Sequence, residues 1–143
     1  MLRTTTWVRL NWGDFKELTE KQKHLVVISN RGRLVAAAMP PDQWKAMATA
    51  RGIDLARLIR KGDSAVKQGL AEALRDAARG MATVSENVYG KYDTLVIAPV
   101  SILDDTVRED YARQAKRAYA EARGPAVWWS GFRRDGRPGC LSV

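Results

Sequence analysis

The sequence predicts an α+β fold, and three observations support this prediction. Short segments rich in β-branched and aromatic residues, typical of strands, alternate with segments whose apolar residues recur at helical spacing. Glycine or proline stands near most of the junctions between these segments. The 143 residues include 45% hydrophobic and 28% charged residues, close to the average of soluble globular domains. We therefore expect most of the chain to fold around a core.

The first elements predict a strand, a helix and the start of a hairpin. β-branched and aromatic residues over positions 5–10 predict a short strand. Asn11 is a favourable N-cap, and the apolar residues that follow it at helical spacing predict a helix to about Lys23. The apolar run over positions 24–29 predicts a second strand.

A turn and a pair of prolines complete the first segment. The sequence Asn30-Arg31-Gly32 tolerates left-handed backbone and predicts a turn, with positions 33–39 as the returning strand. Pro40-Pro41 cannot continue a strand but suits a first helical turn, so we expect a helix over 43–50 that ends at Gly52. Residues 1–52 thus predict a β-α-β-β-α module.

Residues 53–90 predict a helical middle segment, a connector or a partner-binding segment. Apolar spacing predicts one or two helical turns over 53–60 and a longer helix over 63–79, which ends at Gly80. Residues 81–92 have no clear period and predict a loop or a weak strand.

Residues 91–143 predict a small β-α-β-β element of unknown role. The predicted elements are a buried strand over 94–100, a helix from Asp104-Asp105 to Gly124, a strand over 126–132 and a short final strand over 140–143. Both halves of the chain thus have strand–helix–strand–strand order. They share no repeat at the level of residues, so we do not expect an internal duplication.

Charge and composition favour a nucleic-acid partner and offer little for catalysis. The net charge is +8, and residues 1–52 hold 9 Lys and Arg against 4 Asp and Glu. One cysteine excludes an internal disulfide, and the single His24 excludes a site that needs two histidines. We find no catalytic motif and expect no enzyme activity, cofactor or metal. With no signal peptide and no membrane-spanning apolar run, we expect a cytoplasmic protein without a membrane partner.

The run from Val8 to Met47 resembles the N-terminal domain of Phd/YefM-type antitoxins. The resemblance rests on residues 11–18 of the first helix, on 26–33 with the Arg-Gly turn, and on 34–40 leading to the helix that carries Trp44. It implies a homodimer, or a higher oligomer, that presents basic residues to double-stranded DNA. It further implies a transcriptional repressor of its own operon that neutralises a partner toxin.

The resemblance also implies which residues contact DNA. Arg31 matches best, because it stands directly before the turn glycine. The full predicted DNA-binding set is Arg3, Arg9, Lys16, Arg31 and Arg33. Family antitoxins end in a short segment that folds onto a toxin, whereas this chain continues for about 90 residues with strand and helix signals.

Two alternatives stay open. A small enzyme or nuclease-like protein would place its site in residues 91–143 and would draw on acidic residues near the predicted helix and on a basic terminal turn. Those residues are Asp104, Asp105, Glu109, Asp110, Arg133, Arg134 and Arg137. Adjacent acids before a helix are also the ordinary N-cap pattern. The other alternative is an interaction module of a mobile element or phage, and salt-sensitive DNA binding would argue against it.

Overall fold

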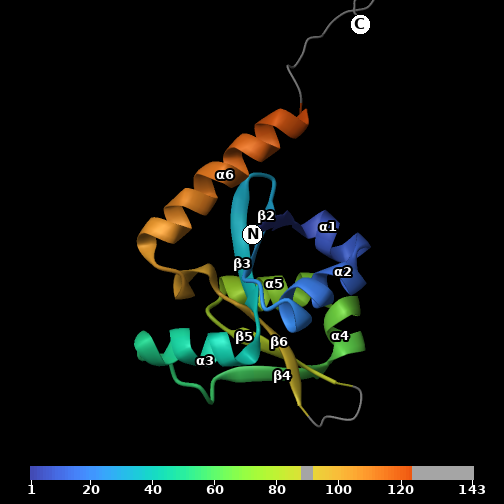
Figure 1. Cartoon of the computed structure of the whole chain (residues 1–143), viewed down its shortest axis with the longest axis vertical. Helices are drawn as coiled ribbons and strands as arrows, with labels where there is room; N and C mark the ends of the chain where they lie inside the picture. The colour runs from blue at the N-terminus through green and yellow to red at the C-terminus, as the bar shows by residue number, and fades with distance from the viewer. Residues whose placement is uncertain (88–91, 124–143) are drawn as a thin grey trace, which may run out of the picture.

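The computed structural model describes residues 1–87 and 92–123, which form a mixed α and β fold (Figure 1). The strands predicted over 126–132 and 140–143, and the basic turn between them, lie outside the described residues.

The described residues contribute to one six-stranded sheet with strand order β1-β2-β3-β6-β5-β4. The strands are β1 Leu2–Thr4, β2 Val26–Asn30, β3 Arg33–Met39, β4 Leu58–Gly62, β5 Ala82–Glu86 and β6 Asp93–Ala98. The two outer pairs, β1 with β2 and β4 with β5, are parallel, and the three inner pairs are antiparallel. Strands from all three segments of the sequence therefore share one sheet.

Helices cover both faces of this sheet and bury one apolar cluster on each. The helical elements are α1 Thr5–Leu10, α2 Trp12–Lys16 with the π-helical turn Glu17–Lys21, α3 Pro41–Ala50, α4 Asp63–Gln68, α5 Leu70–Ala78, the 3-10 turn Val100–Ile102 and α6 Asp105–Arg123. Helices α1, α2, α4 and α5 pack on the face that carries Ile28 and Ile97. Helices α3 and α6, with the 3-10 turn, pack on the face that carries Val27 and Val96. The alternation of side chains along each strand supplies both clusters.

The strand predicted over 5–10 is wrong, because these residues form helix α1. The Thr4 hydroxyl accepts a hydrogen bond from the backbone N–H of Trp7 at 3.1 Å and caps the helix. The helix also buries Val8 completely in the core. Cap and burial together outweigh the strand preference of the β-branched residues, and the strand precedes the predicted position, at β1.

The helical turns predicted over 53–60 are also wrong. Residues 58–62 form strand β4, which pairs in parallel with β5 from Leu58 opposite Ala82 to Gly62 opposite Glu86. The apolar spacing that indicated a helix instead serves a strand, whose ladder partner lies more than 20 residues away in the sequence. The helix predicted over 63–79 is present but is broken at Gly69 into α4 and α5.

The predicted hairpin is confirmed, and α6 packs against its turn. Arg31 and Gly32 have φ values of +52° and +79°, the pair of positive values that a type I′ turn requires. A Cβ atom on Gly32 would lie 3.3 Å from the Cβ atom of Tyr119 in α6. The turn thus packs against α6. This helix begins at Asp105, as the predicted cap at Asp104-Asp105 indicated.

Candidate nucleic-acid interface

The tip of the β2–β3 hairpin exposes two arginines. Arg31 occupies the turn and Arg33 begins β3, and both side chains are exposed. Among the described residues, neither forms an ion pair with an acidic side chain. Arg33 lines a depression together with Arg108, Glu109 and Lys116 of α6. The hairpin therefore presents positive charge on a rigid two-residue turn.

A groove of about 590 Å³ lies beside this tip, between α1, the hairpin and α5. Its walls include the apolar side chains of Val35, Leu70 and Leu74. Arg9 of α1 and Arg75 of α5 also line it; both are exposed, and within the described ranges neither has an acidic partner. The groove is thus apolar along its walls and flanked by two uncompensated positive charges.

A local contact holds α1 beside the hairpin. The hydroxyl of Thr5, the first residue of α1, donates a hydrogen bond of 3.2 Å to the backbone oxygen of Ser29 in β2. Asn30, the next residue of β2, lines the same groove as Arg9. Arg9 is therefore placed near the turn that carries Arg31.

The Arg3 side chain contacts neighbouring residues of the N-terminal segment. Its guanidinium lies 5.0 Å from the ring centroid of Trp7, a cation–π distance, and donates a hydrogen bond of 2.9 Å to the backbone oxygen of Leu2. The side chain is only partly exposed. These contacts place Arg3 against α1 rather than at the hairpin tip.

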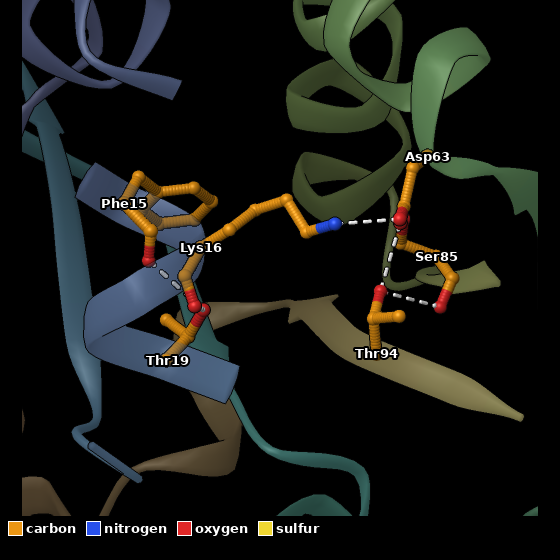
Figure 2. A network of polar contacts seen from close by, with 6 residues as sticks. All are labelled: Phe15, Lys16, Thr19, Asp63, Ser85 and Thr94. Atoms are coloured by element: carbon orange, nitrogen blue, oxygen red, sulfur yellow. Dashed lines mark hydrogen bonds and ion pairs between the residues drawn. The ribbon is translucent and has the colours of Figure 1, made fainter. Parts of the chain in front are cut away.

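Lys16 belongs to an internal polar network that joins α2 to α4 (Figure 2). Its ammonium lies 2.6 Å from the carboxylate of Asp63, the first residue of α4. That carboxylate also accepts hydrogen bonds from the hydroxyls of Ser85 and Thr94. Burial raises the pKa of Asp63, but the hydrogen bonds from Lys16, Ser85 and Thr94 outweigh it and hold the pKa below its ordinary value of 3.8.

The structure thus places three of the five predicted DNA-binding residues around the hairpin. Arg9, Arg31 and Arg33 lie around the hairpin tip and groove, whereas Lys16 has an internal partner and Arg3 stacks on Trp7. Arg75 is the residue that sequence reasoning missed. Its signal was an arginine on the polar side of a predicted helix, which does not tell where that helix packs.

The acids considered for an enzyme site do not converge. Asp104 pairs with Arg51 at 3.1 Å, Asp105 with Arg108 at 2.6 Å, and Asp110 with Arg113 at 3.3 Å. These are exposed ion pairs spread along α6 and its N-terminal approach, of a kind that contributes little to stability. Within residues 1–87 and 92–123, no group of three or more His, Cys, Asp or Glu side chains is arranged to hold a metal ion.

Comparison with known proteins adds no relative: no family model, no curated protein and no solved structure matches the chain. The resemblance to Phd/YefM-type antitoxins stays a prediction. Of the helices that the structure describes, none combines the length and the apolar character needed to cross a membrane.

Proposed function

We propose that the chain is a sequence-specific regulator that binds double-stranded DNA through the hairpin surface, defined as Arg9, Arg31, Arg33 and Arg75. One observation carries the proposal. In the part of the chain that the structure describes, these four arginines are exposed and lack acidic partners; Arg31 and Arg33 lie at the hairpin tip, and Arg9 and Arg75 line the groove that the hairpin shares with α1 and α5. Positive charge that is not neutralised within the protein is available to phosphates, whose binding releases counterions.

The hairpin is suited to recognising the base sequence of DNA as well as to attracting its phosphates. Arg31 projects from a two-residue turn whose backbone is fixed, so its guanidinium reaches outward from a rigid base. An arginine in such a place is suited to the paired acceptors of guanine in the major groove, while Arg9 and Arg75 are suited to the backbone. This division of roles makes Arg31 the residue on which sequence preference depends.

The biological role we propose is that of an antitoxin-type repressor in the cytoplasm. The support is the resemblance of the N-terminal residues to Phd/YefM-type antitoxins together with the basic surface. Bound at its own promoter, the protein would exclude RNA polymerase, and a neighbouring gene would encode a toxin that it neutralises. The hairpin surface takes part in DNA binding and not in toxin neutralisation.

The test is a selection of bound fragments from the source genome, followed by titration of the best fragment with wild type, Arg31→Asn and Arg9→Ala. Arg31→Asn keeps the turn, because Asn-Gly is the preferred type I′ pair. Lys45→Ala is the matched control, since Lys45 is an exposed cation on α3, on the face of the sheet opposite α1 and α5.

We expect a single preferred site, weaker binding by Arg31→Asn and Arg9→Ala, and no change in Lys45→Ala. Binding should weaken steeply between about 0.05 M and about 0.2 M salt. Absence of any enriched fragment, or equal affinity of all variants, would contradict the proposal.

A further inference from the structure

The sheet is symmetric about its centre in both order and direction. The order β1-β2-β3-β6-β5-β4 places the first three strands opposite the last three. Each set has an outer parallel pair followed by an antiparallel hairpin, and the two hairpins meet in an antiparallel β3–β6 pair. A two-fold rotation through that pair would exchange the two sets of strands.

The register supports the same rotation independently. Each hairpin has one irregularity, after Ile28 in β2 and after Ser85 in β5. If Ile28 is aligned with Ser85, their ladder partners Ala36 and Leu95 become equivalent as well. Two residues further along each inner strand, Ala38 is then equivalent to Ile97. These two residues pair with each other at the centre of the sheet. Equivalent residues meet in this way only on a two-fold axis.

The helices repeat with one constant shift. Helices α1 and α4 both have six residues and both follow the outermost strand directly, and a shift of 58 positions superposes them. The same shift aligns four buried positions in the helices of the first set with four in the second: Val8 with Val66, Trp12 with Leu70, Phe15 with Ala73, and Thr19 with Ala77. Proline then follows each inner strand, as Pro40 and as Pro99.

The shift keeps the sign of the charge at some exposed or partly exposed positions. Four pairs keep their sign: Arg3 with Lys61, Arg9 with Lys67, Asp14 with Glu72, and Lys21 with Arg79. At the same shift Glu17 aligns with Arg75, which has the opposite sign, so the duplication rests on strand order, register and helix spacing rather than on charge.

We infer that residues 2–44 and residues 60–103 are two copies of one structural unit fused in a single chain, and that the second copy supplies a second DNA contact at Lys67. The duplication rests on strand order, register and helix spacing, whereas the second contact rests on the proposed function. Lys67 is exposed and occupies the position of Arg9, and α1 and α4 cover the same face of the sheet. One chain thereby offers the paired contacts that a dimer otherwise provides to two half-sites.

The two copies differ where they meet. The positions equivalent to Asp63 and Lys16 are Thr5 and Leu74, and both of these line the groove. The ion pair therefore closes one junction between the copies, while the equivalent junction stays open beside Arg9. We expect the bound DNA site to be asymmetric for this reason.

The experiment combines stoichiometry with a matched set of variants. Light scattering after size exclusion gives the mass of the free chain and of its complex with the selected duplex. Titrations then compare wild type, Arg9→Ala, Lys67→Ala and Lys45→Ala over a range of salt concentrations. We expect a free mass near 15.9 kDa and one chain per duplex. Arg9→Ala and Lys67→Ala should each weaken binding roughly three- to tenfold and lower the salt slope by about one, with Lys45→Ala unchanged.

The outcomes separate the two proposals. If wild type binds no duplex DNA, the proposed function fails and the second contact fails with it. If Arg9→Ala weakens binding while Lys67→Ala equals Lys45→Ala, only the second contact is overturned. Two chains on each duplex would overturn the single-chain arrangement.

Discussion

The ammonium of Lys16 lies 2.6 Å from the carboxylate of Asp63, and this ion pair links the first structural unit to the second. Both side chains are 23% exposed, so water screens the pair less than it would a surface pair. The Ser85 and Thr94 hydroxyls donate to the same carboxylate. Loss of Asp63 would leave the Lys16 ammonium and the Ser85 hydroxyl without this acceptor, whereas the Thr94 hydroxyl also lies 3.0 Å from the backbone oxygen of Ser85.

Asp63→Ala should therefore lower the free energy of unfolding by about 1–3 kcal/mol. Lys16→Met should cost less, because Asp63 keeps two donors, and a double-mutant cycle should show coupling between the two residues. Urea titration followed by circular dichroism measures all three variants. Arg113→Ala, at an exposed pair with Asp110, serves as the control, and equal losses in the control and in Asp63→Ala would count against the account.

The Asp63 carboxylate should make the free energy of unfolding depend on pH in the acidic range. The folded-state pKa of Asp63 lies below its ordinary value of 3.8, so the folded state binds its proton less readily than the unfolded state. The contribution of Asp63 to the free energy of unfolding is complete above pH 3.8 and is lost as the pH falls through the folded-state pKa. We compare the unfolding free energy of wild type with that of Asp63→Asn from about pH 7 to about pH 2.5. The difference should stay constant at higher pH and shrink once the pH falls below the ordinary pKa of 3.8. A constant difference across the range would contradict this.

The hairpin turn should not tolerate a side chain at Gly32. Its φ of +79° is unfavourable for other residues, and an added Cβ would lie 3.3 Å from the Cβ atom and from the Cδ2 atom of Tyr119. Gly32→Ala should lower the free energy of unfolding by about 1–3 kcal/mol. If Tyr119→Ala partly restores the stability of Gly32→Ala, contact with α6 is a cause. Failure of this rescue would assign the loss to the backbone alone.

The duplication predicts a stabilising substitution. Thr4 caps α1, whereas its counterpart before α4 is Gly62, which has φ of −68° and ψ of 158° and no atom within 4 Å of an added Cβ. Gly62→Thr should install the missing cap and raise the free energy of unfolding by about 0.5–1 kcal/mol. Gly62→Val, which lacks the hydroxyl, separates the cap from the backbone effect. A Thr variant no more stable than the Val variant would contradict the equivalence.

Sequence reasoning succeeded where local chemistry decides the structure. The Arg31-Gly32 turn and the strand after it follow from residues that tolerate positive φ, and the helix after Pro40 follows from the fixed φ of proline. It failed over 5–10 and 53–60, where a cap at Thr4 and a distant ladder partner override the local pattern.

The candidate site was predicted in part for the same reason. Arg31 and Arg33 flank a turn that the sequence defines, so their exposure followed from it. The partner of Lys16 lies 47 residues away, and the position of Arg75 depends on where α5 packs on the sheet, which no local pattern encodes. The repeat leaves little trace in the sequence, because few residues are identical and the offset changes from 58 positions between α1 and α4 to 57 between Ile28 and Ser85 and 59 between Ala38 and Ile97.

The most direct measurement of the central claim is the specificity ratio of the wild-type chain. The selected duplex and a duplex of the same length with scrambled sequence are titrated at about 0.15 M salt. We predict that the selected duplex binds at least about 10³-fold more tightly, and that Arg31→Asn removes most of this ratio. Equal affinity for the two duplexes would contradict the account.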